Sequence, residues 1–332
     1  MENMKKPLFH RLSFGLVGLL AAGACLFPAL VGAADVAWPK RPIELIVPFR
    51  SGGDTDFYAR TYAKYLEKEL GAAVTVINIE GAGGNIGLQQ LAASRPDGYK
   101  VALGQDGNLF TSKLMGTTDL DHNSFEIAAI GVRDDTAVLV TNKNSGFAKA
   151  QDFLAKARAE PGKYSVGATI SAFSFFVVCK LEAAGNFRLN PVDYGGAAAM
   201  IPAVMGNKIP LVVNSYGVFK QYIDNGDLIA LMVSGEKRNP NFPNVPTVVE
   251  LGMQDAVAAR GYFFAFPKGT DKAIVKKLSD AVGAVQKNPE YAADIKNAYC
   301  VEPFYRDMTT ANKYMDDVWN DMVKYKDAML RK

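Results

Sequence analysis

The most informative segment of the chain reads Val47-Pro48-Phe49-Arg50-Ser51-Gly52-Gly53-Asp54-Thr55-Asp56. It follows an apolar run over residues 43–47 and precedes an amphipathic pattern over residues 56–70 that ends at Gly71. This order predicts a strand, a tight glycine turn and a helix. Glycine lets the backbone bend sharply, and a helix N-terminus offers unpaired N–H groups with a partial positive charge. The segment therefore favours a binding device over a catalytic one.

A second glycine turn follows a strand pattern over residues 74–79 and reads Gly81-Ala82-Gly83-Gly84-Asn85-Ile86-Gly87. Two such turns in one half of the chain predict a cradle in which backbone N–H groups hold a carboxylate. The residues expected there are Phe49, Ser51, Gly52, Gly53, Thr55, Asp56, Gly83, Gly84 and Asn85. Within this set Asp56 is expected to cap its helix rather than touch an anionic ligand. The alternative is that the glycines only serve tight connections. If the cradle exists, Gly84→Val should abolish binding with little loss of fold.

Strand and helix patterns alternate along the rest of the chain and predict two α/β domains. Strands are expected near residues 99–104, 125–132 and 136–141, and a second unit follows with strands near 164–168, 190–194, 209–214 and 228–234. A strand over residues 261–267 then returns to the first unit. We therefore expect a first domain over residues 34–139 and 262–332 and a second over residues 140–261, with two crossing strands as the hinge and a ligand cleft between the domains.

Polar and glycine residues follow several of these strands, at the edge that lines the binding crevice in open α/β sheets. In the first domain they are Gln105 and Asn108, for which an ordinary polar turn is the alternative; Asp106 would repel an anion unless it faces away. In the second domain they are Thr169, Ser171, Tyr194, Gly195, Gly196, Ala197, Asn214 and Tyr216. We expect this second set to close over the part of the ligand that the cradle does not hold.

The first residues are typical of an export signal. Lys5, Lys6 and Arg11 form a basic start, residues 12–30 are mostly apolar, and Val31-Gly32-Ala33 offers a cleavage site, so residues 1–33 are expected to be removed. A membrane anchor and a lipoprotein attached through Cys25 are the alternatives. Removal leaves 37 − 3 = 34 basic and 34 − 1 = 33 acidic residues, a net charge of +1. This near-neutral chain has no basic stripe, which excludes a nucleic-acid partner. We expect a monomer in the periplasm.

Catalytic and cofactor sites lack their usual residues. After export, His122 is the sole histidine, no GxSxG motif supplies a serine nucleophile, and no cysteine or histidine cluster has zinc spacing. The second glycine turn does not fit a dinucleotide fingerprint. We therefore expect no cofactor, no metal and no enzyme activity, with an exported hydrolase as a remote alternative. Cys179 and Cys300 are expected in different domains and unpaired.

The chain resembles the Bug-type solute receptors of tripartite tricarboxylate transporters over essentially its whole exported length. The resemblance rests on both glycine turns and on Trp38-Pro39-Lys40-Arg41-Pro42-Ile43, Pro96-Asp97-Gly98-Tyr99, Tyr194-Gly195-Gly196-Ala197, Val245-Pro246-Thr247 and Pro267-Lys268-Gly269-Thr270. It implies a type II periplasmic binding protein whose two domains close on a ligand. It also implies a ligand carboxylate between the two N-terminal loops, and delivery to a permease with a large and a small membrane subunit. A receptor that serves a membrane sensor kinase would share this fold.

Three departures from the family pattern bear on the ligand. Arg50 and Ser51 stand where two prolines usually follow the phenylalanine, and Arg50 either offers a fork to a second carboxylate or points to solvent. Phe173 belongs to an unusually bulky segment and is expected to wall the cleft beside an apolar or aromatic ligand body, whereas Phe176 is as well placed for the core. Asn214 replaces a frequent aspartate, which favours a ligand without a free amine. Mono-, di- and tricarboxylates and aromatic acids remain open.

Overall fold

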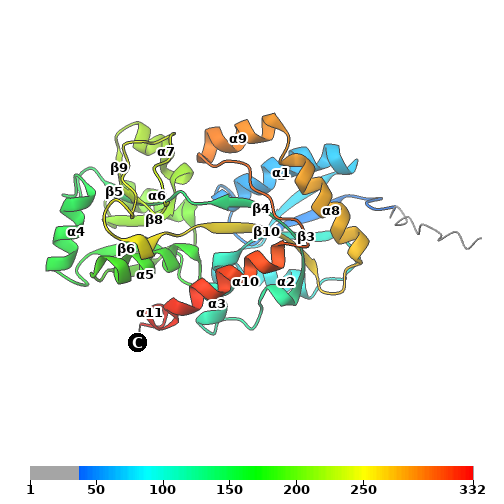
Figure 1. Ribbon diagram of the computed structural model, residues 1–332, viewed down its shortest axis with the longest axis horizontal. Helices are drawn as coiled ribbons and strands as arrows, with labels where there is room; N and C mark the ends of the chain where they lie inside the picture. The colour runs from blue at the N-terminus through cyan, green and yellow to red at the C-terminus, as the bar shows by residue number, and fades with distance from the viewer. Residues whose placement is uncertain (1–36, 332) are drawn as a thin grey trace, which may run out of the picture. The chain divides into compact units, whose positions relative to one another are not determined.

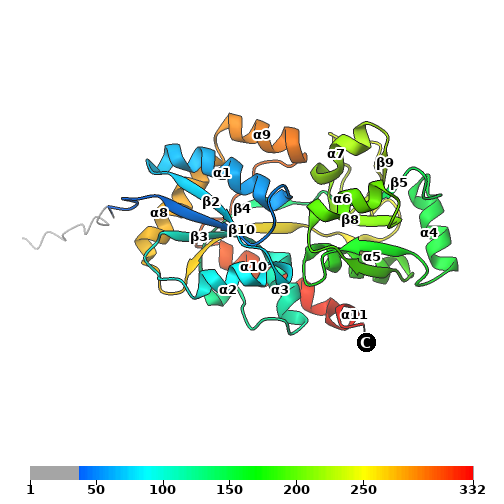
Figure 2. The same ribbon diagram turned by 180° about the vertical axis from the view of Figure 1, so that it is seen from behind.

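The computed structural model describes residues 37–331. These residues form one compact unit that contains two five-stranded sheets, seen in Figure 1 and from behind in Figure 2. The predicted signal peptide, with Cys25 inside it, lies outside the described residues. None of the helices over residues 37–331 combines the length and the apolar character that crossing a membrane requires.

The first sheet has the strand order β2-β1-β3-β10-β4. Its strands are β1 (Ile43–Val47), β2 (Val74–Asn78), β3 (Lys100–Gln105), β4 (Phe125–Asp134) and β10 (Arg260–Pro267). β1 pairs in parallel with β2 and β3, and β10 runs antiparallel between β3 and β4. β10 is buried along its whole length and reads Arg-Gly-Tyr-Phe-Phe-Ala-Phe-Pro, as expected for a strand that is covered on both faces.

Helices cover both faces of this sheet. In Figures 1 and 2, α1 (Asp54–Leu70), α8 (Lys272–Val285) and α9 (Pro289–Tyr299) lie on one side. α2 (Asn85–Ala92), α3 (Asp106–Leu114) and α10 (Ala311–Met322) lie on the other. The core on the second side continues from Phe110 of α3 to the aromatic side chains of α5 (Phe173–Gly185), so the two sheets share one apolar layer there.

The second sheet has the order β7-β6-β8-β5-β9. Its strands are β5 (Ala137–Asn142), β6 (Ser165–Ala168), β7 (Asn190–Asp193), β8 (Leu211–Ser215) and β9 (Leu228–Val233). Its helices are α4 (Ala150–Ala159), α5 (Phe173–Gly185), α6 (Ala197–Met205) and α7 (Tyr216–Asp224). β6 is parallel to both β7 and β8, while β5 is antiparallel to β8 and β9.

The chain passes between the sheets at two adjacent places. β4 ends at Asp134 and β5 begins at Ala137, while the return crossing enters β10 at Arg260, which pairs with Asp134. We therefore place the first boundary at residues 135–136, since the expected one at 139–140 falls inside β5. Four polar residues, Arg133 to Thr136, separate the apolar runs of β4 and β5, so the sequence itself marks the crossing.

Two helices differ from the sequence expectations. α3 begins at Asp106, where the sequence indicates a polar turn, because Gln105 and Asn108 form a capping box and caps use the same residue types as turns. The sequence over residues 309–329 predicts one helix, but a 3-10 turn, Val323–Tyr325, separates α10 from α11 (Lys326–Met329).

Candidate ligand-binding cleft

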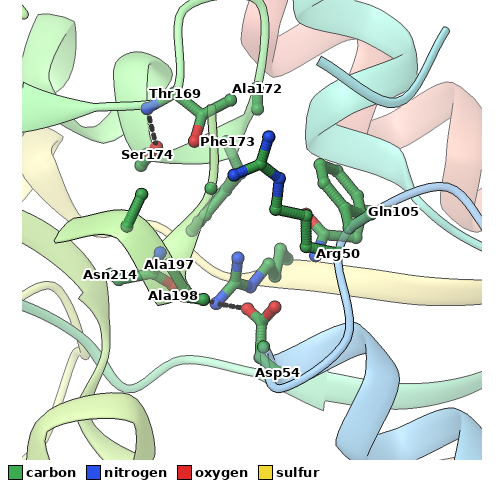
Figure 3. A pocket seen from close by; sticks show the side chains of 15 residues that line it. Arg50, Asp54, Gln105, Thr169, Ala172, Phe173, Ser174, Ala197, Ala198 and Asn214 are labelled. Carbon is green, nitrogen blue, oxygen red and sulfur yellow. Dashed lines mark hydrogen bonds and ion pairs between the residues drawn. The ribbon is translucent and has the colours of Figure 1, made fainter. Parts of the chain in front are cut away.

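A cavity lies between the two sheets, at the carboxyl ends of β1, β3, β6 and β8 (Figure 3). Its volume is about 30 Å³, which is space for no more than a few water molecules. The lining residues from the first sheet and its helices are Phe49, Arg50, Gly53, Asp54, Gln105 and Arg260. Those from the second are Thr169, Ala172, Phe173, Ser174, Gly196, Ala197, Ala198, Ala199 and Asn214.

Three helices begin at this cavity. α1 starts after Gly53, α5 after Ala172 and α6 after Gly196, and all three of these N-cap residues line the cavity or precede one that does. The first turn of α1 already carries two acidic residues, whereas α5 and α6 have neither an acidic residue in the first turn nor a side chain bound at the cap. An anion in the cavity would therefore find free helix-terminal charge at α5 and α6.

The donors expected from the first glycine turn are engaged within the chain. The carboxylate of Asp56 accepts hydrogen bonds from the backbone nitrogen of Gly52 at 3.0 Å and from Ser51 Oγ at 3.1 Å. Burial alone would raise the pKa of Asp56, but hydrogen bonds from Arg60, Gly52 and Asn78 outweigh burial and hold it below its ordinary value. The first turn thus holds an internal carboxylate, and Ser51 and Gly52 do not line the cavity.

Thr55 also lies behind the cavity wall. Its side chain is fully buried, and its Oγ1 accepts a hydrogen bond from Gln105 Nε2 at 2.7 Å. Gln105 itself does line the cavity, while Asn108 is buried beneath it.

The second glycine turn packs against the second sheet's loops instead of opening into the cavity. Asn108 Nδ2 donates to the Gly83 carbonyl at 3.0 Å, and a Cβ at Gly83 would lie 3.2 Å from the Ile170 carbonyl oxygen. Gly84 has a φ of +99°, and a Cβ there would lie 2.6 Å from Asn108 Nδ2. The expectation that Gly84→Val would spare the fold is therefore wrong. Asn85 is buried as well and donates to Thr117 Oγ1 at 3.4 Å.

The structure brings eight of the expected ligand residues to the cavity and leaves twelve away from it. The eight are Phe49, Gly53, Gln105, Thr169, Phe173, Gly196, Ala197 and Asn214. The twelve are Ser51, Gly52, Thr55, Asp56, Gly83, Gly84, Asn85, Asn108, Ser171, Tyr194, Gly195 and Tyr216. Among these, the Ser171 carbonyl accepts from Ser112 Oγ at 3.0 Å, and Tyr216 stacks on Phe242 with ring centroids 3.9 Å apart.

Two charged residues that line the cavity, Arg260 and Asp54, were not expected from the sequence. Arg260 is 3% exposed, and its Nη2 lies 2.6 Å from Asp54 Oδ2 and 3.4 Å from Asp134 Oδ2. Burial opposes the charge of Arg260, but Asp54 and Asp134 outweigh burial and raise its pKa. Arg260 is the charged first residue of an otherwise apolar strand, and this position is the feature of the sequence from which its role could have been predicted.

Asp106 faces away from the cavity. Its carboxylate accepts from the backbone nitrogens of Gly107 at 2.5 Å and Gly261 at 2.7 Å, and from the hydroxyl of Tyr314 at 3.3 Å. Complete burial raises the pKa of Asp106 to about 7 despite these hydrogen bonds. The residue therefore ties the start of α3 to β10 behind the cavity floor.

Comparison with known proteins decides the family. The model of the TctC family, the tripartite tricarboxylate transporter family receptor, matches residues 58–328. The chain belongs to this receptor family. The receptor is 31% identical to a protein from the gbd 5′ region of Cupriavidus necator, over 87% of this chain and 88% of that protein. It is 30% identical to protein BugT of Bordetella pertussis, over 80% of this chain and 81% of BugT. The resemblance to Bug-type receptors is thus confirmed.

Solved structures agree on the fold of the receptor. The periplasmic binding protein BugD has a TM-score of 0.77 and 26% identity, with 89% of this chain and 98% of BugD covered. An R. palustris protein solved with adipate has a TM-score of 0.81 and 24% identity, with 87% and 98% covered. MatC from Rhodopseudomonas palustris, solved with malate, has a TM-score of 0.78 and 19% identity, with 88% and 100% covered. The predicted two-domain periplasmic binding fold is confirmed.

Two other sequence expectations concern single side chains of the receptor. Arg50 lines the cavity with a side chain that is 63% exposed and forms an ion pair with Glu80, so it combines a solvent position with access to the mouth. Phe173 lines the cavity, as expected for a residue at the wall of the cleft, and Phe176 is buried in the core. Cys179 and Cys300 are both buried and free, which confirms that they do not pair.

Proposed function

We propose that this receptor binds a small organic carboxylate in the cavity between its sheets. The observation that carries the proposal is that α5 and α6 begin at the cavity without an acidic residue or a side-chain cap, whereas α1 is supplied with its own carboxylates. Two proteins of the same fold were solved with malate and adipate, both of them dicarboxylates, which supports an organic acid as the ligand.

The carboxylate lies at the first turn of α6, beside Gly196, Ala197 and Ala198. These small residues leave the backbone N–H groups open to the cavity, and a helix N-terminus stabilises a negative charge there. Phe49 and Phe173 flank the apolar body of the ligand. Both glycine turns of the first domain are left out of the proposed contacts. The Gly52 donor is occupied by Asp56, and the residues of the second turn do not line the cavity.

The receptor works in the periplasm as a monomer, after removal of residues 1–33, and passes its ligand to the large and small membrane subunits of a tripartite transporter. It performs no reaction. Membership of the transporter receptor family supports this role, since a receptor of a transporter needs a permease to receive the ligand. The permease role is tested by uptake of the radiolabelled ligand in cells that carry or lack this receptor.

Thermal unfolding of the purified protein against pairs of acids and their amides tests the binding proposal. A ligand that binds only the folded protein raises the unfolding midpoint by mass action. We expect midpoint shifts with one or more carboxylates and a smaller shift with the matching fully amidated compound. Shifts with sugars or amines alone, and none with any acid, would contradict the proposal.

A further inference from the structure

The guanidinium of Arg260 contacts polar groups of the described part of the protein through only one of its three nitrogens. All its hydrogen bonds and ion pairs with the described residues run through Nη2, whose partners are Asp54, Asp134, Asn214 and Ser215. Nε is buried and has no hydrogen-bond partner within residues 37–331. A guanidinium carries five N–H donors, so the donors on Nε and Nη1 are left for another acceptor.

The unpaired donors belong to the ligand cavity. Arg260 lines it and is 3% exposed, and its guanidinium lies over the rings of Phe173 and Tyr262, with 5.3 and 5.4 Å from its carbon to the ring centroids. These two rings restrict the plane of the guanidinium, so its free edge has a fixed direction. A buried donor without an acceptor is costly, and an acceptor on the ligand removes that cost.

The charge around Arg260 decides which acceptor fits. Two carboxylates, those of Asp54 and Asp134, lie within 3.4 Å of Nη2 and face a single guanidinium. Two carboxyl groups of the protein therefore already share one guanidinium at the cavity floor. A carboxylate of the ligand at Nε would be repelled by both acidic residues, because Coulomb energy falls only as the inverse of distance in a poorly solvated site. A carbonyl, hydroxyl or amide oxygen gains the charge-assisted hydrogen bond without that repulsion.

We propose that Arg260 is a specificity-determining residue that donates from Nε and Nη1 to an uncharged oxygen on the ligand. The receptor then selects acids with one carboxylate and a neutral oxygen at the far end, ahead of both dicarboxylates and unsubstituted acids. This inference rests on the proposed function for the carboxylate end, which α6 holds. The two ends are separable by experiment because they use different groups of the protein.

Isothermal titration calorimetry with matched probes tests the selection. The six-carbon set is hexanoate, adipate, adipate monoamide and adipamide, and the four-carbon set is butyrate, succinate, succinate monoamide and succinamide. In at least one set we expect the monoamide to bind about tenfold or more tightly than either the simple acid or the diacid, as for one hydrogen bond to a charged group. Equal affinity for the monoamide and the simple acid, or tightest binding of the diacid, would overturn the inference and leave the proposed function standing.

Arg260→Lys provides the matching variant, because lysine keeps a cation beside Asp54 but lacks the Nε and Nη1 donors. We expect this variant to lose the preference of about tenfold for the monoamide over the simple acid. Arg133→Lys is the control, since Arg133 adjoins the same crossing, pairs with Asp135 at 3.2 Å and does not line the cavity. An unchanged preference in Arg260→Lys would overturn the role of Arg260. Should that variant not fold, the probe comparison on the unaltered protein still decides.

Binding of the diamides alone, dependent on Arg260, would contradict the proposed function and not this inference. Binding of no probe would contradict both.

Discussion

The carboxylate of Asp56 lies 3.0 Å from the backbone nitrogen of Gly52 and accepts its hydrogen bond. The first glycine turn therefore does hold an anion at a helix N-terminus, as its sequence indicates, but the anion is a side chain of the same helix. The same site cannot also hold a ligand while Asp56 stays in place. This relationship moves the proposed carboxylate site to the first turn of α6 across the cavity.

Replacing Asp56 is expected to weaken the fold and spare ligand binding. Asp56→Ala removes the acceptor for Gly52, Ser51 and Asn78, so we expect a loss of about 1–3 kcal/mol in the free energy of unfolding. Urea denaturation measures this loss, with Asp280→Ala, an exposed partner of Lys276, as a control expected to cost under about 1 kcal/mol. Loss of acid binding in a folded Asp56→Ala protein would return the first turn to the binding site.

The acid sensitivity of that variant should also change. The folded pKa of Asp56 lies below its ordinary value of 3.8, so its contribution to stability is present above 3.8 and is lost as the pH falls through the folded pKa. The advantage of the unaltered protein over Asp56→Ala is therefore expected to shrink below that value. Unfolding measured along a series of acid pH values checks it, and a constant difference would contradict the cause assigned to the shift.

The two glycine turns are expected to tolerate alanine differently. Gly52 and Gly84 have φ angles of +86° and +99°, so both substitutions strain the backbone by about 1–2 kcal/mol. A Cβ at Gly52 meets nothing within 4 Å, whereas one at Gly84 lies 2.6 Å from Asn108 Nδ2 and 3.2 Å from Phe49 Cζ. Thermal unfolding should rank Gly84→Ala as the less stable variant. Equal unfolding midpoints for the two variants would contradict this ranking, because they would mean that Asn108 and Phe49 move away from the added Cβ at no cost.

Asp106 is expected to make the protein less stable as the pH rises toward neutrality. Burial raises its folded pKa from 3.8 to about 7, so between these values the folded protein binds a proton that the unfolded chain does not. The contribution of this residue to stability then falls by up to about 1.4 kcal/mol per pH unit and is lost above the folded pKa. Asp106→Asn should flatten the pH dependence in this range, although it weakens the contacts with Gly261 and Tyr314. An unchanged slope in urea denaturation against pH would contradict this assignment.

The sequence predicts the layout of strands and helices well because each element carries its own pattern. The apolar run before the first glycine turn and the cap at Gly71 define β1 and α1 without knowledge of the rest of the fold. The start of α3 is not predicted from the sequence, because the polar residues of its capping box are also typical of a turn.

The candidate site is harder to predict, because whether a donor is free depends on partners that are distant or share the same turn. Ser51 and Gly52 look available until Asp56 is folded back on them. Thr55 looks available until Gln105, fifty positions along the chain, donates to it. Arg260 becomes part of the floor only because the return crossing brings it beside Asp54. The chemistry of an anion at a helix N-terminus is foreseen from the sequence, but the choice of helix is not.

The central claim is that the ligand carboxylate lies at the first turn of α6, and Ala198 offers the most direct test. Ala198 is exposed, stands in that turn and lines the cavity. Ala198→Asp places a fixed carboxylate there, which should leave the fold intact or stabilise it by about 0.3–1 kcal/mol. Ala198→Asn has the same size without the charge and serves as the control.

The decisive measurement is the affinity of both variants for the tightest-binding acid, by isothermal titration calorimetry. We expect Ala198→Asp to bind the acid at least about tenfold more weakly than Ala198→Asn, which adds a side chain of the same size without the charge. Equal affinity of the two variants for the acid would contradict a ligand carboxylate at the start of α6.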